Sequence, residues 1–510
     1  MKPKKSQAPA PRAQEIELKL ALPTSDPASL AKRLARTPVL ARRKATQQSL
    51  HNVYYDTPTQ LLRRERVALR LRRVGGEGPA QWLQTLKTGG RDDSALSQRG
   101  EWETAVPDAA LSPAALRATP WAALDPDGAV FRTLAPCFVT RFERTLWQVS
   151  RRDGSVVEVA LDIGQIEAGD QTAPICELEL ELLAGAPAAL FEVAQQIARS
   201  VAVLPASLSK AGRGYALAQD TLDQPQPAQL PALSSELPWP QAARQALRQM
   251  FGQFTANLNA LRRSDDPELV HQARVGWRRF QSALRLYRPV LDVAGLPDWQ
   301  SLQALLACLG AVRDLDVART DTLPPLASAF IAGDARRASA WQSMLQELAQ
   351  AATLQRKAVR YALQEPAVGA TLLAASQWLE GLVLPGAAAA GVAGRKKYLR
   401  RWAQGRIQRL HQRLKRARQQ AGTPERLHRV RLLAKRLRYG IEALQPLLTG
   451  KQPQRWHQQA LRLQSGIGAS RDLTQAAALL ARLPADRGLV EFLRGLALGR
   501  QTTPAEGEKA

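Results

Sequence analysis

Charged residues recur two positions apart in the N-terminal half of the chain, and their types are those that bind metal ions and phosphates. Near the start, Glu15, Glu17 and Lys19 alternate with three apolar residues. Such alternation predicts a β-strand with one charged and one apolar face. Taken alone, the pattern is equally typical of a surface strand whose charges face solvent. The repetition of this spacing in later segments favours a shared charged face.

Further charged positions follow at a similar spacing, often two apart: Arg70 and Arg72, Lys87, Arg99 with Glu101 and Glu103, Arg144, Glu158 and Asp162, and Glu177, Glu179 and Glu181. Arg141 and Arg144 lie on opposite faces of one expected strand, so only one of them points inward. In a closed barrel, alternate residues line the lumen. Salt bridges alone explain such a lumen poorly, because buried ion pairs are costly. Carboxylates bind hard divalent cations, and Arg and Lys bind phosphate oxygens. The pattern therefore predicts a metal-bound polyphosphate as ligand.

The elements expected to position these residues are strands separated by glycine-rich turns. The eight predicted strands are Glu15–Leu22, Gln47–Tyr55, Val67–Arg73, Gln81–Thr88, Arg99–Val106, Phe138–Val149, Ser155–Ile166 and Ile175–Leu183. Helices are expected over Ser25–Arg36, around Ser112–Ala118 and over Pro187–Ser200. Eight antiparallel strands with short connections predict a closed barrel with flanking helices over residues 14–218.

The second half of the chain has a different composition. Residues 219–240 are rich in proline and read as a linker, and residues 241–500 show helical spacing without strand-like alternation. A segment from His271 to Arg279 is echoed at His428–Arg436, and each copy is followed about 40 residues later by an Arg-Asp pair, Arg313-Asp314 or Arg471-Asp472. We expect an α+β multidomain protein whose C-terminal part is an all-α duplicated helical bundle. Residues 1–13 and 501–510 are expected to be a disordered leader and a loose tail.

The charge distribution points to an anionic partner. The net charge is +26, and residues 241–500 hold 41 Lys and Arg against 17 Asp and Glu. Three widely spaced cysteines predict neither a disulfide framework nor a zinc cluster. No run approaches 18 apolar residues, and the N-terminus has no apolar signal segment. We therefore expect a cytoplasmic protein without a membrane partner.

Basic residues of the second half recur at helical spacing. His271, Arg274 and Arg278 fall on one stripe, which His428, Arg431, Lys435 and Arg438 repeat. A charged stripe is commonly a solvated helix face, and a metal site at the histidines is a weaker alternative. Residues 395–440, however, hold 17 Lys and Arg and one acid, Glu425. Positive charges at this density repel one another unless an anion is nearby, so the segment predicts a polyanion-binding groove.

The N-terminal half resembles the CYTH superfamily, the triphosphate tunnel metalloenzymes. The matching motifs are Glu15-x-Glu17-x-Lys19, Tyr54-Tyr55-Asp56-Thr57, Leu69-Arg70-Leu71-Arg72, Thr85-Leu86-Lys87-Thr88, Val159-Ala160-Leu161-Asp162-x-Gly164, Glu177-x-Glu179-x-Glu181 and Ser209-Lys210-x-x-Arg213-Gly214-Tyr215. The resemblance implies an eight-stranded tunnel that hydrolyses or cyclises triphosphates with Mg²⁺ or Mn²⁺.

The resemblance also implies roles for individual residues. The metal ligands would be Glu15, Glu17, Glu177 and Glu179, and the phosphate contacts would be Lys19, Arg70, Arg72, Lys87, Arg144 and Lys210. Glu103 or Asp162 would orient the attacking water, and Lys87 would also act in catalysis. Glu101 and Glu158 would hold metal, position water or tune their neighbours. Glu181 is an alternative third metal ligand, and Arg141 is an alternative to Arg144.

The second half is similar to the CHAD domain, which is often fused behind CYTH. This resemblance implies polyphosphate binding by His271, Arg274, Arg278, Arg279, His428, Arg431, Lys435 and Arg438. Arg313-Asp314 and Arg471-Asp472 are alternatively structural pairs at helix ends. Together the two resemblances imply an inorganic triphosphatase that also binds long-chain polyphosphate. The alternatives are a triphosphatase acting on thiamine triphosphate or nucleotides, an adenylate cyclase, and a non-catalytic protein that binds polyphosphate or nucleic acid.

Overall fold

The computed structural model describes residues 14–24, 26–76, 78–90, 94–230, 239–291, 294–382, 392–420 and 423–502. The chain divides into two compact units, Met1–Gln224 with Leu363–Gln377, and Pro225–Ala362 with Trp378–Ala510. The expected leader, residues 231–238 of the expected linker and residues 503–510 of the expected tail lie outside the described residues. No helix in the described ranges is both long enough and apolar enough to cross a membrane.

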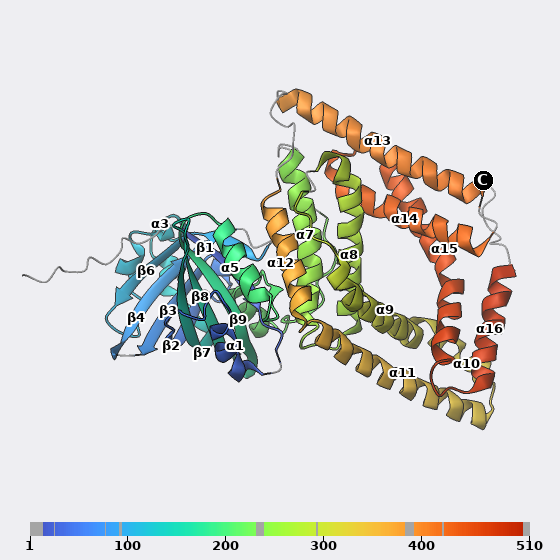
Figure 1. Cartoon of the computed structure of the whole chain (residues 1–510), viewed down its shortest axis with the longest axis horizontal. Helices are drawn as coiled ribbons and strands as arrows, with labels where there is room; N and C mark the ends of the chain where they lie inside the picture. Colours follow the sequence, from blue (N-terminus) through green and yellow to red (C-terminus); the bar gives the residue numbers. More distant parts are fainter. Residues whose placement is uncertain are drawn as a thin grey trace, which may run out of the picture. The chain divides into compact units, whose positions relative to one another are not determined.

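The first unit is built on an antiparallel sheet that curls into a barrel (Figure 1). Its strands are β1 (Glu15–Ala21), β2 (Thr46–Asp56), β3 (Ala68–Gly76), β4 (Gly78–Lys87), β5 (Leu96–Arg99), β6 (Glu101–Val106), β7 (Ala135–Ser150), β8 (Val156–Ala168), β9 (Gln171–Ala184) and β10 (Leu204–Pro205). The sheet order is β10-β1-β9-β8-β7-β2-β3-β4-β6, and β5 pairs with β1. Counting β5 and β6 as one strand, and leaving the two-residue β10 aside, the ring has eight strands. The predicted antiparallel barrel is confirmed.

The barrel closes at a break in one strand. We predicted a continuous strand from Arg99 to Val106, but Gly100 separates β5, which pairs with β1, from β6, which pairs with β4. A Cβ on Gly100 would lie 2.4 Å from the Trp102 ring and 2.7 Å from Thr88 Oγ1. Glycine therefore permits the close approach at which one segment changes partner and joins both edges of the sheet.

Helices cover the outer face of the barrel, except the last helix of this unit before the linker, which packs against inward-facing residues of β2 and β7. The short helices are η1 (Pro27–Ser29), α1 (Leu30–Ala35), α2 (Leu61–Arg64), η2 (Pro113–Leu116), α3 (Trp121–Leu124) and α4 (Ala129–Arg132), and the longer ones are α5 (Ala188–Ala198) and α6 (Lys210–Ala218). Leu18 and Leu20 of β1 and Leu180 of β9 are fully buried in one cluster with residues of α1 and α5. Each such leucine contributes roughly 2 kcal/mol of burial free energy. The apolar strand face therefore packs outward, which leaves the charged face for the interior.

Helix α6, which the sequence analysis did not predict, packs against β7, β8 and β9. The Ser209 side chain caps its first turn by accepting a hydrogen bond from the Gly212 amide at 3.0 Å. Tyr215 of α6 meets the Phe138 ring edge-on at 5.0 Å, and Phe138 stacks on Tyr54 at 4.6 Å. This aromatic packing fixes the start of α6, where Lys210 lies.

Asp56 is expected to stabilise the folded barrel. Its buried carboxylate accepts hydrogen bonds from the Leu62 and Arg63 amides at 2.8 and 3.0 Å and from the Tyr215 hydroxyl at 2.8 Å. Replacing Asp56 by alanine leaves these donors without their acceptor, so we expect a loss of about 3 kcal/mol and a thermal midpoint roughly 10 °C lower. Differential scanning calorimetry measures the change. The control is Asp153→Ala, a substitution in an exposed turn. If its thermal midpoint fell as far as that of Asp56→Ala, this role of Asp56 would be contradicted.

The second unit is helical, as predicted. Its elements are α7 (Trp239–Ala260), α8 (Pro267–Tyr287), η3 (Arg288–Val290), η4 (Gln300–Leu302), α9 (Gln303–Val317), η5 (Ala318–Thr322), η6 (Pro324–Leu326), α10 (Ala327–Ile331), α11 (Ala335–Ala362), α13 (Val392–Gln419), α14 (Pro424–Leu444), η7 (Gln445–Leu447), α15 (Gln452–Leu480) and α16 (Arg487–Thr502). Helices α8 and α14 are both 21 residues long, start with a proline after a capping side chain, and are followed by a short 3-10 turn. These parallels support the internal duplication.

Helix α12 (Pro366–Glu380) belongs largely to the first unit, although the sequence analysis placed it within residues 241–500. Leu373 is fully buried in the same cluster as Leu18 and the α5 residues. A Cβ on Gly369 would lie 2.1 Å from the Val203 carbonyl oxygen. Gln195 of α5 donates a hydrogen bond to the Ala370 carbonyl at 3.4 Å. The first unit is therefore completed by residues far along the chain.

Candidate active site in the barrel and a cationic cluster

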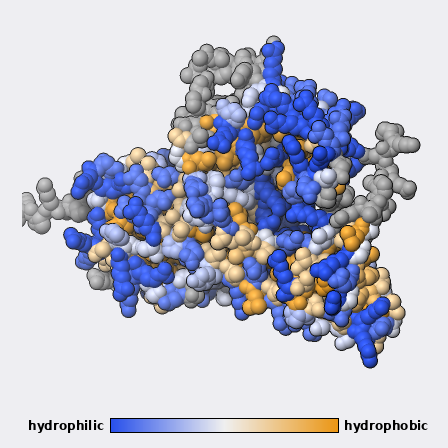
Figure 2. Space-filling model, turned by 45° about the vertical axis from the view of Figure 1, so that its right-hand side comes forward, coloured by the Kyte–Doolittle hydropathy of each residue, from blue (hydrophilic) through white to orange (hydrophobic). Residues whose placement is uncertain are grey.

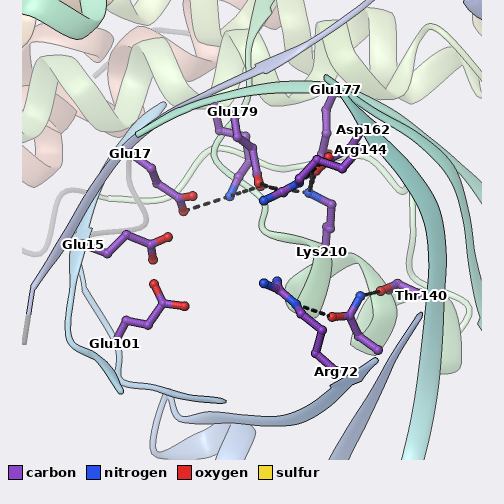
Figure 3. A network of polar contacts seen from close by, with 12 residues as sticks. Glu15, Glu17, Arg72, Glu101, Thr140, Arg144, Asp162, Glu177, Glu179 and Lys210 are labelled. Carbon is purple, nitrogen blue, oxygen red and sulfur yellow. Dashed lines mark hydrogen bonds and ion pairs between the residues drawn. The ribbon is translucent and has the colours of Figure 1, made fainter. Parts of the chain in front are cut away.

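Charged side chains point into the space that the strands enclose (Figure 3). Strand register aligns opposite charges across neighbouring strands, since Lys19 faces Glu179 and Arg144 faces Asp162. It also places two acids side by side, because Asp162 faces Glu177 on its other neighbour. Alternation along each strand therefore builds rows of acids and bases inside the barrel. The ion-paired residues of this interior are Glu15, Glu17, Lys19, Arg70, Arg72, Lys87, Arg99, Glu101, Glu103, Arg144, Asp162, Glu177, Glu179, Lys210 and Arg213.

Three carboxylates, Asp162, Glu177 and Glu179, form what we call the acidic triad. Their candidate ligand oxygens lie within 4.8 Å of one another, and the first two side chains are buried. Lys210 Nζ contacts all three, and Arg144 binds Asp162 and Glu179 at 2.7 Å each. Oxygen donors at this separation suit a hard divalent cation such as Mg²⁺ or Mn²⁺. The donor set of the triad therefore suits a hard divalent cation, and it joins two of the four expected metal ligands, Glu177 and Glu179, with Asp162.

The two acids of β1 belong to a neighbouring group. Lys87 Nζ lies 2.8 Å from Glu15, and the Arg99 guanidinium reaches Glu15 at 2.9 Å and Glu17 at 2.6 Å. Lys19 links this group to the triad, because its ammonium lies 3.1 Å from Glu17 and 3.5 Å from Glu179. The four expected metal ligands therefore fall into two pairs joined by a lysine.

The arginines of β3 form a basic wall. Arg70 lies 3.6 Å from Glu101, and Arg72 donates to the Asn52 side chain at 2.8 Å and lies 3.7 Å from Glu103. Burial, followed by the repulsion from Arg70, lowers the pKa of Arg72 to about 10. The charge of Arg72 is therefore poorly compensated and attracts an anion. Burial alone would also lower the pKa of Arg70, but Tyr54, Glu101 and Glu103 raise it. The planar geometry of both guanidinium groups suits phosphate oxygens.

The carboxyl groups differ in how readily they ionise. Burial alone would raise the pKa of Glu179, but Lys210, Lys19 and Arg144 hold it well below the usual value. Burial, followed by repulsion from Glu15 and other acids, raises the pKa of Glu181 to about 7. At neutral pH the triad residue Glu179 is therefore ionised, as a metal ligand must be, whereas Glu181 is partly protonated.

In the helical unit, basic residues of four helices influence one another and form what we call the cationic cluster. Its members are His271, Arg274 and Arg278 of α8, Arg313 of α9, Arg431, Lys435 and Arg438 of α14, and Arg471 of α15. A Cβ on Gly310 of α9 would lie 3.1 Å from an Arg274 guanidinium nitrogen, so this glycine makes room for the arginine. Burial, followed by repulsion from Arg278, lowers the pKa of Lys435 to about 7. Cations held this close favour the binding of an anion.

Helix α13 adds exposed basic residues outside this cluster. Arg409, Arg413 and Arg416 lie on its exposed face, whereas Ala403 and Ile407 are buried. Figure 2 shows hydrophilic side chains gathered over α13, at the top of the view. The expected density of positive charge in this part of the chain is therefore displayed at the surface.

Two family models match the chain: the CYTH domain over residues 13–215 and the CHAD domain over residues 245–481. The chain therefore has a region that matches the CYTH domain, followed by a region that matches the CHAD domain, and we call these regions the CYTH domain and the CHAD domain. It is 35% identical over 206 residues to an inorganic triphosphatase of Haemophilus influenzae, covering 40% of this chain and 55% of that protein. The chain thus spans about half the length of this curated relative.

Solved structures are also similar. The CHAD domain from the plant Ricinus communis is 29% identical, covers 55% of this chain and 93% of that chain, and has a TM-score of 0.45. A protein from Hippeastrum, described as a putative adenylyl cyclase with a dominant triphosphatase activity, is 18% identical. It covers 41% of this chain and 96% of that chain, with a TM-score of 0.28.

All the residues predicted to line the CYTH tunnel lie in the barrel interior, and the structure adds two more. Arg144 points inward and Arg141 lies on the outer face beside Glu167, which decides between these two arginines. Arg99 and Arg213 belong to the sequence patterns described above, but no role was predicted for them. Arg99 binds both acids of β1, and Arg213 lies 3.3 Å from Glu177. The signal for Arg99 was its spacing of two from Glu101.

In the CHAD domain the structure separates the expected binding residues. Arg279 is 2% exposed and donates to the Gln253 side chain and the Gln229 carbonyl, so it packs inside the unit rather than in the cationic cluster. His428 is exposed on α14, one turn before Arg431. The two Arg-Asp pairs were expected at helix ends, yet Arg471 lies in the middle of α15 and, with Arg313, adds to the cluster. Helix packing, which the sequence does not display, brings them there.

Proposed function

We propose that the CYTH domain hydrolyses inorganic tripolyphosphate to pyrophosphate and phosphate with Mg²⁺ or Mn²⁺, and that the CHAD domain binds long-chain polyphosphate. The observation that carries the first part is the pairing of an acidic triad with an arginine wall inside one closed barrel. A pure anion-binding site would gain nothing from buried carboxylates, because they repel the anion. The 35% identical inorganic triphosphatase supports the choice of substrate.

The proposed mechanism assigns the chemistry to positioned charges. Arg70, Arg72 and Lys87 would bind the phosphate oxygens and stabilise the charge that develops on the leaving group. A divalent cation bound at the triad would neutralise phosphate charge and help to activate water. Asp162 belongs to the triad, which leaves Glu103 to orient the attacking water. Glu103 suits this role because it accepts a hydrogen bond from Thr85 at 2.9 Å and faces Arg72.

Phosphate release from tripolyphosphate, with ATP and thiamine triphosphate as competing substrates, tests this function. We expect hydrolysis with Mg²⁺ or Mn²⁺, none with EDTA, and the highest kcat/KM for tripolyphosphate. Absence of metal-dependent release from all three compounds would overturn the enzymatic function. A reducing compartment such as the cytoplasm fits the three free cysteines, Cys137, Cys176 and Cys308.

Polyphosphate binding by the CHAD domain is expected to weaken as the pH rises. Lys435 faces Arg278, Arg431, Arg438 and Arg471, with Asp472 also nearby. Because its pKa is lowered to about 7, its positive charge is largely present at pH 6 and largely lost at pH 8. We expect about tenfold weaker binding at pH 8 than at pH 6, since one proton is linked to binding. Isothermal titration of a long-chain polyphosphate at both pH values measures this difference.

Lys435→Arg provides the control for this pH dependence, because an arginine keeps its charge across the range. The variant is expected to bind almost equally at both pH values. The same tenfold change in this variant would show that another group titrates.

A further inference from the structure

Lys210 lies where a metal ion held by the acidic triad would lie. Its Nζ is 2.6 Å from Asp162, 2.5 Å from Glu177 and 3.0 Å from Glu179. Its side chain is 7% exposed. Among the residues that the structure describes, no other basic group forms ion pairs with all three acids. One ammonium thus gathers the three carboxylates, as a small spherical cation would.

The contacts of Lys210 differ in kind from those of Arg144. Arg144 donates directed hydrogen bonds to Asp162 from two nitrogens and to Glu179 from one, all at 2.7 Å. Lys210 Nζ and Glu177 Oε1, by contrast, are buried atoms for which no contact reaches good hydrogen-bond geometry. Lys210 therefore stabilises the triad by its positive charge rather than by directed hydrogen bonds. A divalent cation can replace that contribution, while Arg144 keeps its own contacts with the triad.

A divalent cation and the Lys210 ammonium cannot share the triad, because like charges at this separation repel strongly in a buried site. The flexible four-carbon stem of lysine allows the ammonium to move while the start of α6 stays in place. An aromatic surface is also near, since the Phe142 ring centroid lies 5.0 Å from Nζ.

We propose that Lys210 occupies the metal position of the triad in the metal-free protein, and that a divalent cation displaces its ammonium into the lumen, where it binds substrate phosphate. The first half of this exchange concerns the metal alone. The second half rests on the proposed triphosphatase function. The exchange would couple metal binding to phosphate binding, because the Lys210 ammonium becomes free to bind phosphate only when the metal occupies the triad.

Titration of the full-length protein with Mn²⁺ in the absence of phosphate tests the first half. Lys210→Met removes the competing charge, so we expect Mn²⁺ to bind about tenfold more tightly than to the unaltered protein. Lys87→Met is the matched control, because this lysine is also inside the barrel but pairs with Glu15 and Glu101. We expect its Mn²⁺ affinity to change much less. Unchanged or weaker binding in Lys210→Met would overturn the exchange.

A measurement on the unaltered protein covers the case in which Lys210→Met does not fold. Lysine acetylation by an amine-reactive ester, read by mass spectrometry, reports whether the Lys210 ammonium is held in the triad. We expect Lys210 to be modified severalfold faster in saturating Mg²⁺ than in EDTA, with Lys32 as the surface reference. Equal or slower modification in Mg²⁺ would contradict displacement. Neither experiment requires hydrolysis, so failure of the triphosphatase function would be recognised separately.

Discussion

Replacing Glu179 by glutamine is expected to lower kcat/KM for metal-dependent tripolyphosphate hydrolysis by about a thousandfold. Glutamine keeps the size of the side chain and the strand register, but it removes the charge that the triad offers to a metal. The loss corresponds to about 4 kcal/mol of transition-state stabilisation, which is reasonable for a metal ligand. Steady-state kinetics with Mn²⁺ varied over a wide range separates weaker metal binding from a slower chemical step.

The control for this variant is Glu167→Gln. Glu167 lies on β8, as does Asp162 of the triad, but it points to the outer face of the barrel and pairs with Arg141. We expect this variant to hydrolyse tripolyphosphate normally, and circular dichroism to show both proteins folded. More than a tenth of normal activity in Glu179→Gln would exclude the triad as the metal site.

Neutralising the centre of the cationic cluster is expected to have the second largest effect. In the variant with Arg278→Gln and Lys435→Gln, we expect long-chain polyphosphate to bind about a hundredfold more weakly. The charge of Arg278 contributes to the lowered pKa of both His271 on α8 and Lys435 on α14. Its loss therefore affects both repeats of the CHAD domain. The dependence of affinity on salt should also become shallower by up to two ions, because fewer phosphates are neutralised.

Arg494→Gln is a suitable comparison for this double variant. Arg494 is exposed on α16 and pairs with Glu491, three residues earlier. The Arg494→Gln substitution removes positive charge from the same unit but leaves the residues of the cationic cluster unchanged. If it weakens polyphosphate binding as much as the double variant does, binding follows net charge rather than the cluster. Hydrolysis of tripolyphosphate should be normal in both proteins.

The strands and their charged faces could be predicted because the period of two is a local property of the backbone. Once Glu15 was assigned to the interior, the side of Glu17 and Lys19 followed without any knowledge of neighbouring strands. The same parity rule showed that only one of Arg141 and Arg144 could point inward. It could not show which one, since that depends on the register between β7 and β8.

Contacts between elements far apart in the sequence could not be predicted from this periodicity. The motif around Lys210 implied a phosphate contact in the tunnel, but the contact of Lys210 with the triad could not be predicted, because it depends on the aromatic packing that positions α6. Arg279 follows Arg278 directly and shares its charge, yet helix packing turns it toward Gln253. Periodicity assigns residues to the faces of a helix, but only the tertiary structure determines what each face meets.

The packing of α12 has a practical consequence for dividing the protein. The barrel unit draws Leu363–Gln377 from within the segment that matches the CHAD domain. A fragment ending in the proline-rich segment after Asp220 would lack Leu373 and would uncover the apolar surface of α5 that this leucine covers. Such a fragment would tend to aggregate for reasons unrelated to catalysis. Assigning activities to the two domains is therefore better done with point variants in the intact chain than with truncations.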